Sequence, residues 1–100
     1  MLLYNVTVKV ELDIENEWLL WMKQIHIPEV LATGLFVKNQ LLRLISQDQE
    51  DGQTYAVQYF CESSELLDEY LKNYAPDLQQ KTRDLYPNKF VAFRTVLEVL

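Results

Sequence analysis

The stretch Glu15–Gly34, ENEWLLWMKQIHIPEVLATG, holds both tryptophans of the chain and its only histidine, His26, close to a proline, Pro28. Apolar residues recur at helical spacing through its first half, at Trp18, Met22 and Ile25. Pro28 lacks a backbone N–H and disfavours helical geometry at the residue before it. We therefore predict a helix over 15–26, a kink, and a short second turn over 28–33, with the final glycine just past its end.

His26 lies at the predicted kink, where a carbonyl of the preceding turn loses its helical partner. In a structural interpretation, which we favour, the imidazole N–H satisfies that carbonyl inside the core. In a functional interpretation, His26 is a general acid–base or a ligand contact, because an imidazole titrates near neutral pH. One histidine and one cysteine do not supply the usual zinc ligands, so we expect no metal site.

Length and charge indicate a small acidic protein. One hundred residues suffice for one hydrophobic core, so we expect a single domain over residues 1–100. The net charge of −6 and the lack of a Lys/Arg cluster argue against nucleic acid or an anionic membrane as partner. Cys61 is the only cysteine, and the N-terminus alternates like a strand, so we expect no disulfide, no signal peptide and a cytoplasmic location. No run approaches the roughly 20 apolar residues of a membrane span.

Four segments have the pattern of strands. Apolar and polar residues alternate over 3–12, and apolar residues occupy both faces over 35–47, 53–61 and 89–100. A polar loop over 48–52 ends in glycine and is typical of a hairpin between the second and third strands.

A second helix is predicted to begin at Ser63 and Ser64 and to break at Pro76 into two pieces. The order β-α-β-β-α-β predicts a ferredoxin-like α+β fold, a four-stranded antiparallel sheet with two kinked helices on one face. The helices cover only that face, while three strands carry apolar residues on both. A second copy of the chain is the simplest cover for the other face, so we expect a homodimer.

Four pieces of the chain carry a family resemblance: YNVTVKV at 4–10, EWLLWMKQIHIPEVLATG at 17–34, TYAVQYFCES at 54–63 and FVAFRTVLE at 90–98. Together they resemble an uncharacterised bacterial group, the domain-of-unknown-function 4286 family, over nearly the whole chain. HIPEVLATG is the most specific piece. The resemblance implies the dimeric α+β barrel superfamily, which includes antibiotic-biosynthesis monooxygenases, stress-responsive barrel proteins and muconolactone isomerases. Such proteins pair their sheets face to face and often hold a pocket between sheet and helices, so fold and dimer are implied but not an activity.

Two candidate sites follow. The first is a pocket between the first helix and the sheet, with candidate ligand contacts at Trp21, His26, Tyr55, Tyr59 and Arg94. The second is a polar patch on the opposite sheet face, formed by Asn5, Thr7 and Lys9 with Gln58 and Arg94. This patch is either the polar rim of a dimer interface or a binding surface for a small anionic or oxygenated molecule.

Two functions stay open. The leading hypothesis is a homodimeric small-molecule-binding or structural module without a cofactor, because no catalytic constellation is present. The alternative is a small cofactor-free monooxygenase or isomerase acting on aromatic substrates, with His26 as proton shuttle. A haem-binding variant is also open, since a lone histidine can be an axial ligand. A hydrogen-bonded His26 in a closed core would remove most support for the enzyme, whereas a cavity at His26 would favour it.

Overall fold

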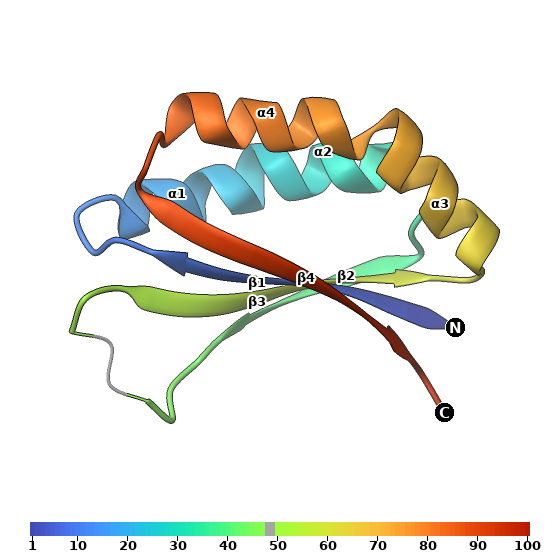
Figure 1. Cartoon of the computed structure of the whole chain (residues 1–100), viewed down its shortest axis with the longest axis horizontal. Helices are drawn as coiled ribbons and strands as arrows, with labels where there is room; N and C mark the ends of the chain where they lie inside the picture. Colours follow the sequence, from blue (N-terminus) through green and yellow to red (C-terminus); the bar gives the residue numbers. More distant parts are fainter. Residues whose placement is uncertain (48–49) are drawn as a thin grey trace.

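The computed structural model describes residues 1–47 and 50–100. The four strands form one antiparallel sheet in the order β2-β3-β1-β4, and the helices all lie on one face of it (Figure 1). This is the predicted ferredoxin-like α+β arrangement. The elements in chain order are β1 (Leu2–Val10), α1 (Glu15–Trp21), η1 (Met22–His26), α2 (Ile27–Ala32), β2 (Lys38–Arg43), β3 (Gln53–Cys61), α3 (Ser64–Asn73), α4 (Ala75–Leu85) and β4 (Phe90–Glu98).

Alternation along the two central strands decides what the helices cover. In the register of β1 and β3, Tyr4 lies opposite Tyr59 and Val8 lies opposite Tyr55, and all four side chains are buried. Trp18 of α1 packs its ring against Tyr55, with 5.0 Å between the ring centroids. The period of two in β1 and β3 thus places one aromatic-rich row of each strand beneath the helices.

The first helix contains one wider, π-helical turn just before Pro28 and continues directly into α2. Met22–His26 is a π-helical turn in which the Ile27 N–H donates to the carbonyl of Met22, five residues back, and α2 follows directly. The backbone therefore supplies the partner that we had expected from the His26 imidazole. Ile25, which the regular helical spacing placed on the buried stripe, is 46% exposed, because the wide turn changes the phase of the helix.

The helix ends follow the predicted chemistry. Gly34 follows α2 with φ of 78°, the left-handed conformation that glycine adopts at little cost. Ser63 precedes α3, and its side-chain oxygen accepts a hydrogen bond from the backbone N–H of Leu66 at 3.3 Å. The second helix breaks between Asn73 and Ala75, as Pro76 predicted.

Three predicted strands are longer than the observed ones, the last of them being β4, which was predicted over 89–100 and covers Phe90–Glu98. β1 ends at Val10, and Leu12 is exposed in the following turn, because the chain must reverse there to enter α1. β2 covers only Lys38–Arg43, so the second strand is shorter than predicted, although Leu41 against the core and Leu42 on the opposite face still make it apolar on both faces. Leu35 and Phe36 are buried in the irregular segment before β2 instead.

The loop between β2 and β3 falls partly outside what the structure describes. Of the predicted hairpin loop over 48–52, Asp48 and Gln49 lie outside the described residues, and Glu50 and Asp51 form a turn.

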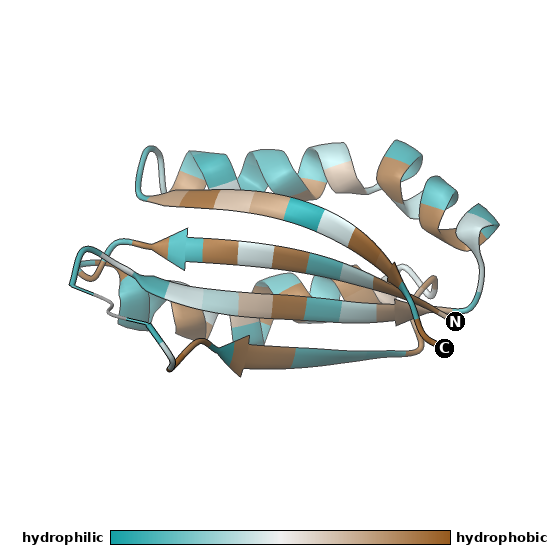
Figure 2. Cartoon of the chain, turned by 60° about the horizontal axis from the view of Figure 1, so that its bottom comes forward, coloured by the Kyte–Doolittle hydropathy of each residue, from teal (hydrophilic) through white to brown (hydrophobic). Residues whose placement is uncertain are grey.

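The face of the sheet that no helix covers, called the open face below, is turned toward the viewer in Figure 2. On this face β1 presents the polar residues Asn5, Thr7 and Lys9, and the large exposed apolar side chains are Leu42, Val91, Phe93 and Leu97. No helix within residues 1–47 and 50–100 is long and apolar enough to cross a membrane.

Candidate functional site

A cavity of about 240 Å³ lies between the helices and the sheet. β1, β3 and β4 form its floor, and α1, η1, α3 and α4 form its walls. The lining is mostly apolar and aromatic, as in ligand sites of proteins generally. Its residues are Tyr4, Val6, Val8, Trp18, Met22, His26, Val57, Tyr59, Tyr70, Leu78, Gln79, Thr82, Arg83, Phe90, Ala92 and Arg94.

Three tyrosines converge on one part of this cavity. The ring of Tyr4 lies 6.3 Å from that of Tyr59 and 5.8 Å from that of Tyr70, measured between centroids. The Tyr59 side chain is 2% exposed, and its hydroxyl has no hydrogen-bond partner among the described residues. Burial raises the pKa of both Tyr59 and Tyr70, so their hydroxyls stay protonated. The Tyr59 O–H is therefore a buried hydrogen-bond donor with no acceptor in the described part of the chain.

His26 reaches the cavity from the end of the π-helical turn. Its ring stacks on Trp21, with 4.9 Å between the ring centroids and 28° between the planes. Burial lowers the pKa of His26 to about 4, and the charges of Arg94 and Lys81 act in the same direction against the opposing charge of Glu29. The imidazole is thus uncharged at neutral pH. It can hydrogen-bond a ligand, but it is a weak base.

Two arginines lie at the solvent side of the cavity, and we call them the mouth: Arg83 on α4 and Arg94 on β4, both exposed. Burial raises the pKa of the Tyr4 hydroxyl, and the Arg94 guanidinium partly opposes this rise through its charge and a hydrogen bond. Arg83 donates a hydrogen bond to Gln80 Oε1 at 2.8 Å. The cavity therefore has an apolar interior and a cationic rim.

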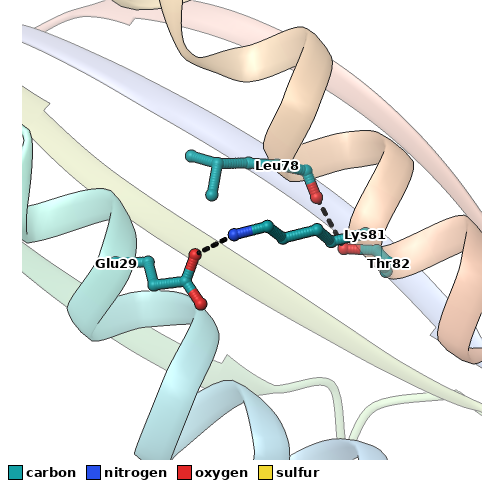
Figure 3. Close-up of polar contacts among 4 residues, drawn as sticks. All are labelled: Glu29, Leu78, Lys81 and Thr82. Atoms are coloured by element: carbon teal, nitrogen blue, oxygen red, sulfur yellow. Dashed lines mark hydrogen bonds and ion pairs between the residues drawn. The ribbon is translucent and has the colours of Figure 1, made fainter.

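An ion pair joins the helices beside the cavity. Lys81 Nζ on α4 lies 3.0 Å from Glu29 Oε2 on α2, as Figure 3 shows. One turn of α4 is also tied by the Thr82 hydroxyl, which donates to the carbonyl of Leu78. Since Leu78 and Thr82 both line the cavity, this turn of α4 positions part of its wall.

Three of the five candidate contacts line the cavity: His26, Tyr59 and Arg94. Trp21 does not line it but supports the His26 ring by stacking. Tyr55 lies elsewhere, because it is four residues from Tyr59 and therefore near the other end of β3. Its hydroxyl donates to Glu15 Oε2 at 2.5 Å and accepts from Arg43 Nη2 at 3.4 Å.

The polar patch on the open face forms without Arg94. Asn5 accepts a hydrogen bond from Gln58 Nε2 at 3.2 Å and donates to the hydroxyls of Thr7 and Thr95 at 3.1 and 3.3 Å. Lys9 lies apart from this network and pairs with Asp51 at 2.8 Å.

The placement of Arg94 on that patch was wrong. β4 pairs with β1 so that Arg94 lies opposite Val6, whose side chain faces the helices. Side chains opposite each other in a ladder share a face, so Arg94 belongs to the cavity.

Sequence reasoning missed Tyr4, Tyr70 and Arg83 as cavity residues. Tyr4 lies in the alternating strand predicted over 3–12 and Tyr70 in the second predicted helix, and both are buried like other core residues. What joins them to Arg83 is the docking of α3 and α4 on the sheet, for which one sequence gives no signal. No group of three or more His, Cys, Asp or Glu side chains in residues 1–47 and 50–100 is arranged to hold a metal ion.

Comparison with known proteins places this fold. The family described as Domain of unknown function (DUF4286) matches residues 1–100, which confirms the predicted resemblance. HapK from Hahella chejuensis has a similar structure, with 9% identity, a TM-score of 0.72 and coverage of 100% of this chain and 93% of HapK. An ethyl tert-butyl ether d (EthD) family protein from Bacillus halodurans is similar at 7% identity and a TM-score of 0.68, with 100% of both chains covered.

A dimeric ferredoxin-like protein from an uncultured marine organism is similar at 14% identity and a TM-score of 0.57. That likeness covers 99% of this chain and 96% of the other. At such identities the likenesses show the fold alone. No curated protein matches the chain.

Proposed function

We propose that this chain, which belongs to the DUF4286 family, is a homodimeric protein that binds a small organic molecule in the cavity between its helices and sheet. Tyr59 carries the proposal, because its side chain lines the cavity and its buried hydroxyl lacks a partner in the described part of the chain. An unpaired buried polar group costs about 1–3 kcal/mol, and a ligand oxygen would remove that cost. A dry cavity of about 150 Å³ holds benzene, so one of about 240 Å³ has room for a fused or substituted ring.

A matched pair of tyrosine variants tests this. Tyr59→Phe removes the unpaired hydroxyl, so the empty protein should gain about 1 kcal/mol of unfolding free energy while affinity for a neutral aromatic amide such as 2-naphthamide falls several-fold. Tyr55→Phe removes a hydroxyl that Glu15 and Arg43 already satisfy, so it should lose stability and leave the affinity unchanged. Urea melts and calorimetric titration measure both effects. Equal effects of the two variants, or no binding of the amide to the native protein, would overturn the proposal.

The homodimer rests on the open face. Val91 and Phe93 are 68% and 62% exposed there, beside a hydrogen-bonded polar network centred on Asn5. The polar side chains of this face already hydrogen-bond one another, and the apolar ones are exposed. A second copy of the open face, related by a two-fold axis, can therefore bury this surface without leaving polar groups unpaired. A stable pair would bury about 800 Å² on each chain.

Light scattering after size exclusion tests the dimer, which should have twice the chain mass of 11.9 kDa. Phe93→Asp places a charge inside the proposed interface and should give monomers. Leu20→Asp is the control, since Leu20 on α1 is 56% exposed and lies on the helix layer. A monomeric native protein, or the same dissociation by both variants, would refute the interface.

The enzymatic alternative has one observation in its favour, because His26 lines the cavity. Its chemistry argues the other way. A general base is most effective with a pKa near the working pH, and burial lowers that of His26 to about 4. Haem also fits poorly, since the macrocycle is larger than a drug-sized ligand and such ligands occupy cavities of about 300–1,000 Å³. We therefore favour binding over catalysis.

Cys61 bears on the compartment. Its buried thiol donates to the carbonyls of Leu35 and Ser63 at 3.4 and 3.3 Å. A single buried thiol forms no disulfide within the chain, so an oxidising compartment would not stabilise this fold. This supports the cytoplasm as its location, which fractionation of cells producing the tagged protein would test.

A further inference from the structure

We infer that the ligand is an organic anion, a flat apolar acid whose ring enters the cavity and whose carboxylate lies at the mouth against Arg94 and Arg83. This rests on the proposed function and names the class of molecule that the cavity takes. It divides the ligand into an apolar part that is buried and a charged part that stays near solvent.

The charge at the mouth is unusual for this chain. Asp and Glu number 15 against 9 Lys and Arg, yet neither mouth arginine has a carboxylate within 4.0 Å in residues 1–47 and 50–100. Glu29, three residues after His26, is the carboxylate whose charge acts on His26, and Lys81 already pairs with it at 3.0 Å. Each guanidinium donates to one neutral oxygen, of Gln80 or of Tyr4, and keeps further donors for an anion from outside the chain. Arginine is well suited to this, because its planar donors match a carboxylate in pairs.

The apolar interior of the cavity disfavours the ligand's carboxylate and favours its aromatic ring. Apart from His26 and the tyrosine hydroxyls, the deep lining is apolar, with Val6, Val57 and Met22 among its members. Burying an isolated carboxylate there would be costly, so the anionic end must stay at the exposed arginines. Exposed ion pairs are individually weak, yet two cations at the rim of one cavity favour an anion over a neutral ligand.

The distance across the sheet suits an aromatic molecule of two rings. Tyr59 lies on β3 and Arg94 on β4, with β1 between them. Two strand spacings amount to about 10 Å, which is the reach of a fused bicyclic acid. One ligand can therefore place an oxygen substituent of its far ring near the Tyr59 hydroxyl and its carboxylate near Arg94.

A charge-matched pair of probes tests the inference on the native protein. The probes are 6-hydroxy-2-naphthoate and its neutral isostere 6-hydroxy-2-naphthamide, whose ring hydroxyl can pair with Tyr59, titrated calorimetrically at pH 7. The acid should bind about fivefold to tenfold more tightly than the amide, and salt near 1 M should remove the difference because it screens exposed charges. Arg94→Gln should abolish the preference without weakening the amide. Lys72→Gln makes the same charge change on α3, outside the cavity, and should preserve the preference.

The outcomes separate the inference from the proposed function. Equal binding of acid and amide would overturn the anion inference while leaving the binding function standing. Loss of both probes in Arg94→Gln, with a lower melting temperature, would also overturn it, because it would assign Arg94 a structural role. Binding of neither probe to the native protein would overturn both.

Discussion

Lowering the pH should destabilise this protein through one side chain, His26. It is the only histidine in the chain, and burial lowers its pKa to about 4 in the folded state. The unfolded chain exposes the same imidazole to water, where its pKa is about 6.5. Above pH 6.5 both states hold it neutral, so it has no effect on stability there. Below pH 6.5 the unfolded state takes up a proton that the folded state resists, and stability falls until pH 4.

These two pKa values fix the magnitude. At pH 5 the unfolded imidazole is almost fully protonated and the folded one is about one-tenth protonated. The difference in proton binding then corresponds to about 2 kcal/mol of lost unfolding free energy between pH 7.5 and pH 5. That is a large fraction of the total for a domain of this size, which lies at about 5–15 kcal/mol.

Urea melts at the two pH values, made on the native protein and on His26→Gln, measure this. Glutamine does not titrate, so the difference between the two pH dependences removes the contribution of the carboxylates. We expect the native protein to lose about 2 kcal/mol more than the variant. Ring signals of the single imidazole in NMR give its pKa directly. Equal losses, or a folded pKa at or above 6.5, would refute the reasoning and return His26 to the role of an accessible proton shuttle.

Gly34→Ala should cost about 1 kcal/mol in urea melts, because the residue has φ of 78° while an added Cβ would meet no atom within 4 Å; a neutral result would contradict the left-handed helix end. Pro28→Ala should change stability by less, since the π-helical turn before it is closed by the Ile27 N–H and not by Pro28. Ser63→Ala should cost about 1 kcal/mol through loss of the cap on α3, whereas the same change at Ser64, inside the first turn, should cost little. Equal costs at the two serines would argue against the cap.

Some of the fold could be read from single residues because their signals are local. β3 was predicted to the residue, since Tyr55, Val57 and Tyr59 alternate with polar or small residues between a glycine and a serine pair. Phe36 shows the limit of such patterns. Its ring lies 4.8 Å from Tyr70 and 5.3 Å from Tyr59, so it belongs to the core although it is in no strand. An apolar residue in an irregular segment has the same local pattern as one in a strand.

The site was harder to predict because it is assembled by register. His26 could be singled out as the lone imidazole beside a proline, and Tyr59 as an inward strand residue. Arg94 was assigned to the wrong face, since the face of β4 depends on which residue of β1 it meets, and that pairing spans most of the chain. No sequence pattern indicates that the Tyr59 hydroxyl lacks a hydrogen-bond partner, because this depends on how side chains from several elements are placed around it.

The π-helical turn over Met22–His26 holds one residue more than a regular turn, and the orientation of the side chains after it depends on that extra residue. A regular helix rotates 100° per residue, so positions four apart drift by about 40° at each step. Trp18, Met22, His26 and Val30 are spaced by four and would wind away from the sheet by about 120° in a uniform helix. The one wide turn resets that phase, which keeps Val30 fully buried and His26 on the cavity. A uniform helix over the same residues would swing everything after this turn by about 100°, whereas deleting one residue between Met22 and His26 would leave the later residues nearly in phase, because the wide turn accommodates one extra residue.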